Sequence, residues 1–114
     1  LGTKQGIQRY GSAVIPMDDV CVMSAVDLSG RPYLLWRVAL PKAKLGEFDV
    51  ELAEVFFDGF VRGSGINLYL KVLEPGNLHH MVEACFKATA RACRIAWTYS
   101  GDAASLPSTK GTLA

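Results

Sequence analysis

Residues 66–99 read INLYLKVLEPGNLHHMVEACFKATARACRIAWTY, and this stretch decides the fold. Residues 66–73 alternate between apolar side chains and polar or aromatic ones, which is the period of a β-strand. Pro75-Gly76 is turn chemistry, and Asn77 is a favourable N-cap for a helix that continues to about Tyr99. Apolar residues lie on most sides of that helix, so we expect it to be well buried.

The residues before this stretch predict three further strands. Segments rich in Val, Ile, Leu, Tyr and Trp occur near residues 11–17, 20–28 and 32–40. Short turn sequences with Pro, Asp, Ser and Gly separate them, as expected between strands of an antiparallel sheet. Residues 41–46 are expected to form a loop.

A first helix is predicted after that loop. Asp49 is placed to cap it, Glu51 opposes the positive end of its dipole, and Gly63 and Gly65 end it. Its apolar stripe, spaced to face a core, consists of Ala53, Phe56, Phe57 and Phe60. The resulting order βββαβα predicts the α+β class, with two helices on one face of a mainly antiparallel four-stranded sheet.

Composition indicates one domain, residues 1–114, with a polar tail at residues 101–114. Half of the residues are apolar, so a hydrophobic core is expected, and the net charge of +1 offers no bulk attraction to nucleic acid or to an acidic membrane. No apolar run is long enough to span a bilayer, and no signal-peptide pattern is present. Three cysteines without CxxC spacing favour a reduced intracellular protein with buried thiols.

Two imidazoles and a carboxylate begin the second predicted helix. His79 lies four residues before Glu83 and His80 three residues before it, so each pair shares a helix face. The adjacent histidines diverge by roughly 100° and would serve different ions, with Glu83 able to reach either. Such ligands suit borderline divalent metals such as Mn, Fe, Ni or Zn. Three ligands cannot close a site, and a solvated polar helix start is the competing interpretation.

A second set of residues could bind an anion if its members converged: Arg9, Arg31, Lys87, Ser108 and Lys110. Guanidinium forks and hydroxyl donors match the oxygens of a phosphate. Taken singly, each of these cations is more often a surface charge or part of a structural ion pair. The anion pocket is therefore a hypothesis that depends on convergence.

Three other side chains have an uncertain role. Asp18 and Asp19 could add a carboxylate to a site, although acidic residues are common in turns. Tyr69 lies on a predicted strand, where packing is the simplest interpretation of a tyrosine.

Six motifs occur in an order that makes the chain similar to a known family. They are Gly6-Ile7-Gln8-Arg9-Tyr10-Gly11, Pro16-Met17-Asp18-Asp19, Val26-Asp27-Leu28-Ser29-Gly30-Arg31-Pro32, residues 77–83, Phe86-Lys87-Ala88 and Pro107-Ser108-Thr109-Lys110-Gly111. Together they closely resemble the C-terminal half of imidazoleglycerol-phosphate dehydratase over essentially all 114 residues.

The resemblance implies a duplicated βββαβα subunit, similar to domain 2 of ribosomal protein S5, in which residues 1–114 are the second half. It implies a hydro-lyase of histidine biosynthesis that converts imidazoleglycerol phosphate into imidazoleacetol phosphate at a dimanganese site. Subunits would assemble through trimers into a 24-subunit shell, in the cytoplasm or in a plastid if the source is a plant. The implied metal ligands are His79, His80 and Glu83, of which Glu83 is also the candidate catalytic residue. The implied phosphate-binding residues are Arg9, Arg31, Lys87, Ser108 and Lys110.

The chain departs from the family pattern in length and at two residues. The other half, with its own metal ligands, is missing, so the chain looks like a fragment, a split subunit or one half of a processed protein. We therefore expect little or no activity from it alone. Tyr69 stands where the family usually has a metal-binding His, and Asp19 where Glu is usual. A phenol, with a pKa near ~10, is a poor Mn²⁺ ligand at neutral pH.

Two alternatives to an enzyme remain open. A non-catalytic member of the fold could keep the phosphate pocket and act as a phosphate-binding or assembly module. Nucleic-acid binding by analogy with the S5-like fold is disfavoured, because the near-zero net charge provides no stripe for a phosphate backbone.

Overall fold

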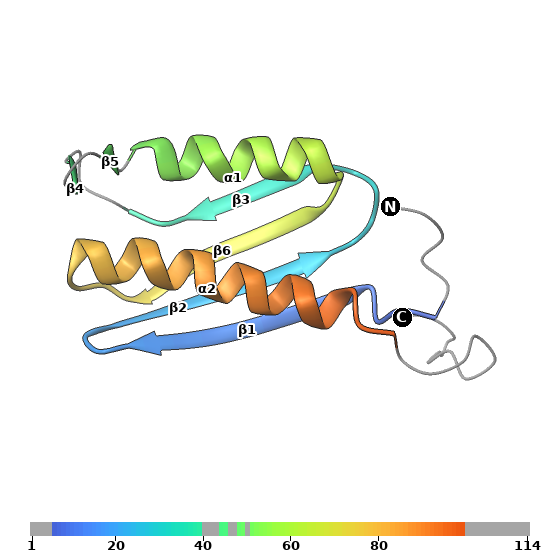
Figure 1. Ribbon diagram of the computed structural model, residues 1–114, viewed down its shortest axis with the longest axis horizontal. Helices are drawn as coiled ribbons and strands as arrows, with labels where there is room; N and C mark the ends of the chain where they lie inside the picture. Colours follow the sequence, from blue (N-terminus) through green and yellow to red (C-terminus); the bar gives the residue numbers. More distant parts are fainter. Residues whose placement is uncertain (1–5, 40–43, 46–47, 50, 100–114) are drawn as a thin grey trace.

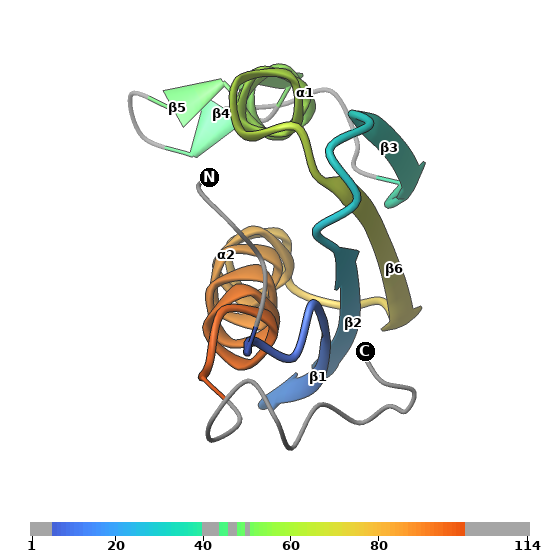
Figure 2. The ribbon, with the colours of Figure 1, turned by 90° about the vertical axis from the view of Figure 1, so that its right-hand side faces the viewer.

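A computed structural model describes residues 6–39, 44–45, 48–49 and 51–99, in which two helices cover one four-stranded sheet (Figure 1). In chain order the elements are β1 (Tyr10–Met17), β2 (Val20–Asp27), β3 (Tyr33–Arg37), β4 (Lys44–Leu45), β5 (Phe48–Asp49), α1 (Glu51–Ser64), β6 (Asn67–Glu74) and α2 (Leu78–Ala96). The end-on view shows both helices on the same side of the sheet (Figure 2). The predicted α+β class is confirmed.

The sheet has the order β1-β2-β6-β3. The β1–β2 and β2–β6 pairs are antiparallel, which confirms the expectation of a mainly antiparallel sheet, whereas β3 and β6 are parallel. Parallel neighbours need a crossover connection, and α1 lies within the one that joins β3 to β6.

Strand alternation sends one set of side chains under the helices and leaves the other on an open face. Val22, Val26, Leu68 and Leu70 are among the buried residues of the helix-covered side. Ser24 of β2 and Thr89 of α2 form a hydrogen bond on this side, with 3.1 Å between their hydroxyl oxygens. It is the only such pair among the described residues there. On the open face Tyr10, Val14 and Tyr33 are each more than half exposed.

All three cysteines were predicted to be buried, and two of them, Cys85 and Cys93, are buried in α2. Burial raises the pKa of Cys85 to about 12 and that of Cys93 to about 11, so both are expected to be unreactive near neutral pH. Cys21 on β2 is only partly buried. No helix in the described part of the chain is both long and apolar enough to cross a membrane.

Three local expectations for the middle of the chain are wrong. The predicted loop 41–46 contains β4, which pairs with β5. Asp49 lies in β5 and so is part of a strand rather than a helix cap. Phe56 was expected to face the core with its stripe, but it is 51% exposed, because α1 carries apolar residues on two sides.

Candidate functional site

Two turns meet at the end of the molecule where α2 begins. The two-residue turn between β1 and β2 consists of Asp18 and Asp19, since Met17 pairs with Val20. Asp18 has a left-handed backbone (φ 52), which aspartate tolerates better than most residues. Antiparallel pairing of β2 with β6 brings this turn beside the turn that leads into α2.

Asp19 connects the two turns through both of its carboxylate oxygens. The backbone N–H of Asn77 donates to Asp19 Oδ2 (2.6 Å), and His80 Nδ1 donates to Asp19 Oδ1 (2.8 Å). A side chain at Gly76 would collide with Asp19, so glycine is required for this approach. Asn77 is the N-cap, as predicted, and its side chain accepts from the N–H of His80 (3.0 Å).

The contact between Asp19 and His80 favours their charged forms. The hydrogen bond to His80 lowers the pKa of Asp19, and the bond from Asn77 adds to this effect. The hydrogen bond to Asp19 raises the pKa of His80. The ring is thereby held at Nδ1, while its Nε2 faces Asp18, whose Oδ2 is 3.6 Å away.

His79 belongs to a different face of the helix, as its position in the sequence predicts. Its Nε2 lies 3.5 Å from Glu83 Oε1, and Glu83 Oε2 lies 3.2 Å from Lys87 Nζ. The side chain of His79 is 68% exposed, so its ring is open to solvent. Glu83 is therefore placed between an imidazole and an ammonium group along one helix face.

These groups form two imidazole–carboxylate pairs rather than one cluster. Within the described residues, no group of three or more His, Cys, Asp or Glu side chains is arranged to hold a metal ion. The donors are nevertheless of the type that borderline divalent metals use, and a histidine whose Nδ1 is held by a carboxylate is typical of metal-binding histidines. The donor types suit such a metal, but these pairs alone do not complete a site.

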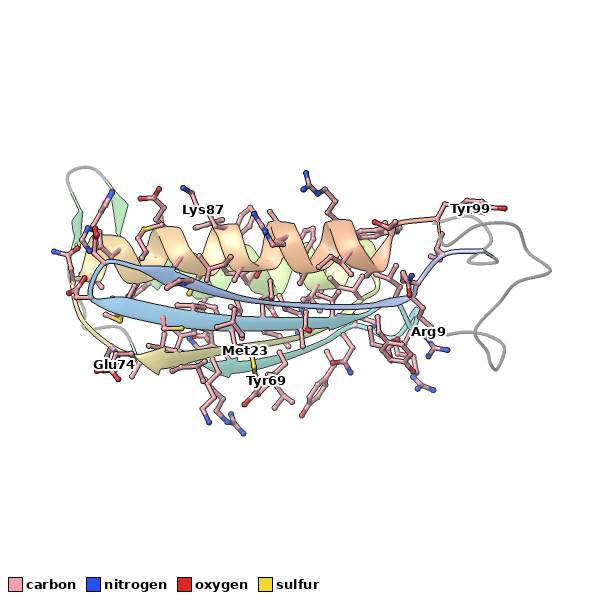
Figure 3. The ribbon with its side chains drawn as sticks, turned by 90° about the horizontal axis from the view of Figure 1, so that it is seen from below. Arg9, Met23, Tyr69, Glu74, Lys87 and Tyr99 are labelled. Carbon is pink, nitrogen blue, oxygen red and sulfur yellow. The ribbon has the colours of Figure 1, made fainter. Side chains whose placement is uncertain are left out.

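The predicted phosphate-binding residues that the structure describes do not gather around the histidines in a single chain. The N–H of Arg9 donates to the carbonyl of Ala96 at the far end of α2 (2.9 Å). Ala96 lies sixteen positions after His80 in α2, which corresponds to about 24 Å along the helix axis. Figure 3 shows Arg9 and Lys87 far apart along the long axis of the molecule.

Arg31 lies at the same end as Arg9, because Asp27 and Tyr33 both pair with Asn67 there. Arg9 has a left-handed backbone (φ 74), and its Nε donates to Asp27 (2.8 Å), which raises the pKa of Arg9. Arg31 is exposed in a turn closed by the hydroxyl of Ser29, which accepts from its N–H (3.1 Å). Of the three predicted phosphate ligands that the structure describes, only Lys87 lies near the histidines; Ser108 and Lys110 lie outside the described residues.

Tyr69 lies away from the histidines. It pairs with Ala25 and Leu35 in the middle of the sheet, and its side chain points away from the helices (Figure 3). The histidines of the same chain therefore do not share an ion with it.

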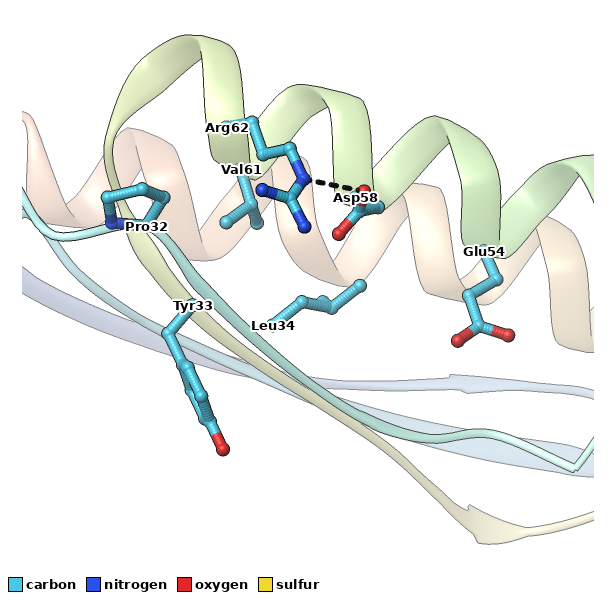
Figure 4. Close-up of a pocket in the computed structure, with 7 residues that line it drawn as sticks. All are labelled: Pro32, Tyr33, Leu34, Glu54, Asp58, Val61 and Arg62. Atoms are coloured by element: carbon cyan, nitrogen blue, oxygen red, sulfur yellow. Dashed lines mark hydrogen bonds and ion pairs between the residues drawn. The ribbon is translucent and has the colours of Figure 1, made fainter.

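A pocket between α1 and β3 adds no further candidate. It is lined in part by Glu54, Asp58 and Arg62 (Figure 4). Arg62 Nε donates to Asp58 Oδ2 (2.9 Å), so these opposite charges already satisfy each other.

The fold and the site together define an α+β protein whose second helix begins with imidazole–carboxylate pairs of the kind that bind divalent metals. The family profile of imidazoleglycerol-phosphate dehydratase matches residues 1–93. A protein of that name from Citrifermentans bemidjiense is 55% identical over 113 residues, which are 99% of this chain and 58% of that protein. Another, from Jannaschia sp., is 52% identical over 114 residues, with the same shares covered.

Solved structures agree with these matches. The crystal structure of imidazoleglycerol-phosphate dehydratase from Staphylococcus aureus superposes with a TM-score of 0.79 at 44% identity, covering 82% of this chain and 54% of that one. The enzyme from Pyrococcus furiosus, solved in complex with (S)-C348, gives 0.77 at 39% identity over 96% and 60% of the two chains. The chain therefore belongs to the imidazoleglycerol-phosphate dehydratase family and spans somewhat more than half the length of these relatives.

Two features that build the site were not predicted from the sequence. Asp19 was only an uncertain candidate ligand, whereas in the structure it is the hydrogen-bond partner of His80. Gly76 had no predicted role, although a glycine between a proline and an N-cap signals a close backbone approach.

Proposed function

We propose that this chain contributes metal ligands to a hydro-lyase of histidine biosynthesis that dehydrates imidazoleglycerol phosphate to imidazoleacetol phosphate. His79, His80 and Glu83 would bind Mn²⁺, and the missing N-terminal half, or an equivalent chain, would complete a site with two ions. The contact between Asp19 and His80 is the observation that carries this proposal, because it presents the ring with one nitrogen fixed and the other available. Membership of the family supports it.

Each residue would have a distinct part in the reaction. Bound metal would draw electron density from the substrate's imidazole and so favour loss of the neighbouring proton and hydroxyl group as water. Asp19 fixes the orientation of His80, and Lys87 holds Glu83 beside His79. Glu83 is the candidate for moving the proton.

The substrate phosphate would be bound by Arg9, Arg31, Lys87, Ser108 and Lys110. Because Arg9 and Arg31 lie at the end of the molecule opposite the histidines, they would serve a site in a neighbouring copy. This requirement favours a homo-oligomer, with trimers that assemble into a 24-subunit shell. The proposed location is the cytoplasm, or a plastid for a plant protein.

The test compares the 114-residue chain with an assembly that also contains polypeptide equivalent to the part of its relatives that the chain does not cover. We expect bound manganese and dehydratase activity in the assembly, and little or no turnover from the chain alone with Mn²⁺. In the assembly, His80→Ala should lower both the manganese content and the activity, whereas Arg94→Ala, exposed on the same helix, should change neither. Full turnover by the isolated chain, or unchanged manganese in His80→Ala, would contradict the proposal.

A non-catalytic phosphate-binding or assembly module is the second candidate, favoured by the separation of Arg9 and Arg31 from the histidines. It predicts inorganic phosphate binding to the metal-free chain that Arg9→Ala abolishes, with no manganese in any assembly.

The role of Tyr69 also helps to distinguish the enzyme from the non-catalytic module. If Tyr69 weakens one metal site, Tyr69→His should raise the manganese content of the assembly, and no change would remove that role.

A further inference from the structure

The side of α2 that packs on the sheet is nearly uniform along its length. α2 lies over β1 and β2 (Figure 2). It carries alanines at four-residue spacing, all fully buried: Ala84, Ala88, Ala92 and Ala96. If α2 were displaced along its axis by four positions, about 6 Å, this stripe would present almost the same surface. The alanines therefore do not decide where along the sheet α2 comes to rest.

The strands beneath α2 are similarly uniform. On β1 the helix-facing positions include Gly11 and Ala13, and a Cβ at Gly11 would collide with the backbone of α2. Helix backbone recurs at every turn, so this close approach does not select one position of α2 either. On β2 every second residue is buried, and all but one of these are valine: Val20, Val22, Ser24 and Val26.

One hydroxyl pair interrupts this apolar contact. Ser24 and Thr89 are the only buried polar or charged residues in the described part of the chain, with exposures of 0% and 5%. Their hydroxyl oxygens lie 3.1 Å apart, so each hydroxyl is the hydrogen-bond partner of the other. A buried hydroxyl that loses its partner destabilises the folded state.

The residues one turn away from Thr89 cannot replace it. Cys85 lies four positions before it and Cys93 four positions after it. A thiol is only a weak hydrogen-bond donor and acceptor. Displacing α2 by one turn in either direction would leave Ser24 opposite a thiol and would place the hydroxyl of Thr89 among the valines of β2. The pair therefore opposes the displacements that the alanine stripe tolerates.

We propose that Ser24 and Thr89 are positioning residues that fix the register of α2 along the sheet and thereby place both ends of this helix. Thr89 lies nine positions after His80 and seven positions before Ala96, near the middle of α2. A pair at this point acts on both ends of the helix.

Both ends of α2 make contacts that depend on this register. At one end His80 bonds to Asp19 (2.8 Å), and at the other the carbonyl of Ala96 accepts from the N–H of Arg9 (2.9 Å). A displacement of about 6 Å would break both bonds, since hydrogen bonds form at about 2.7–3.2 Å. The relevance of the register to catalysis rests on the proposed function of His80 and Arg9, whereas the register itself does not.

Three variants of the metal-free, 114-residue chain separate positioning from stability. Thr89→Val keeps the shape of the side chain but leaves the Ser24 hydroxyl unpaired, so it should lower the urea midpoint. Adding Ser24→Ala removes the unpaired hydroxyl, so this double variant should return toward the wild-type midpoint although the pair is lost. Ser24→Thr combined with Thr89→Ser exchanges the two hydroxyls and nearly conserves volume, so the exchanged variant should behave as the wild type.

Amide hydrogen exchange measures the register in these variants. The N–H of Arg9 is the reporter, because its acceptor, Ala96, lies in α2. The N–H of Tyr33 is the reference, because it donates to Ile66, away from α2 (3.1 Å). The protection of Arg9 relative to Tyr33 should fall by about tenfold or more in the double variant and stay at the wild-type level in the exchanged variant. Ser12→Ala, which removes an exposed hydroxyl from β1, should change neither the midpoint nor the protection.

The outcomes distinguish this proposal from a purely structural role and from the proposed function. Wild-type protection of Arg9 in the double variant would overturn the proposal, and so would an equal loss in the exchanged variant. A parallel loss at Arg9 and Tyr33 would also overturn it, because the pair would then contribute stability alone. Neither metal nor substrate enters these measurements, so their failure leaves the proposed function standing, and an assembly without manganese leaves the register result standing.

Discussion

Asp19 illustrates how one carboxylate can organise a site from a turn. It binds the backbone N–H of Asn77 and the ring of His80, and this places the start of α2 against the β1–β2 turn. The adjacent Asp18 approaches the other ring nitrogen of His80 at 3.6 Å, a looser contact. Two neighbouring aspartates therefore have different influence on the same histidine.

The stronger contact of Asp19 predicts that this residue, more than Asp18, sets the pKa of His80. In the wild type the pKa of His80 should lie above its ordinary value, because the hydrogen bond to Asp19 stabilises the imidazolium form. Asp19→Asn should return the pKa toward about 6.5, whereas Asp18→Asn should retain most of the elevation. NMR titration of the metal-free chain measures both variants, and an equal fall in the two would contradict the assignment.

The same contact predicts a pH dependence of folding stability. The raised pKa of His80 gives stability that is full below about pH 6.5 and is lost as the pH rises through the raised value. The lowered pKa of Asp19 gives stability that is present above about pH 3.9 and is lost as the pH falls through the lowered value. The Tm difference between wild type and Asp19→Asn, both metal-free, should therefore be larger near pH 5 than near pH 9. An unchanged difference would show that the charged pair does not form.

At the scale of elements, the close packing of α2 on β1 depends on Gly11. A Cβ at this position would collide with the backbone of Ala92 and Ala96, which cannot move aside as a flexible side chain could. Gly11→Ala should lower the free energy of unfolding by about 1–3 kcal/mol, the usual cost of overpacking. The neighbouring Ser12→Ala, on the exposed face of the same strand, should change it by less than about 0.5 kcal/mol. Urea denaturation measures both, and equal effects would refute this packing argument.

Elements were predictable from sequence where their signals are local. Strand alternation and the cap at Asn77 depend on adjacent residues, and the structure confirms them. The position of Phe56 depends on which of two apolar sides of α1 meets the sheet, and helical periodicity alone does not distinguish them. The contact between Asp19 and His80 needs the pairing of β2 with β6, which joins residues far apart in the chain.

At the scale of the whole molecule, the candidate metal-binding histidines and the candidate phosphate-binding arginines lie at opposite ends of the long axis. In the sequence, Arg9 and His80 belong to the same family pattern. The structure shows that His80 lies at the start of α2, whereas Arg9 lies beside its last residue, Ala96. A phosphorylated imidazole is far shorter than about 24 Å, so one molecule cannot contact both sets in a single copy. If both sets serve the proposed reaction, each site combines residues from different copies.

This conclusion predicts complementation between two defective variants of the active assembly. His80→Ala removes the metal ligand and Arg9→Ala removes the phosphate ligand, so each homogeneous assembly should be almost inactive. When the two are unfolded, mixed equally and reassembled, a site that takes His80 from one copy and Arg9 from another is intact by chance in about a quarter of cases. The mixture should therefore recover up to about a quarter of wild-type activity. No recovery, with wild-type subunits regaining activity under the same protocol, would mean that Arg9 and His80 do not act across copies in one site.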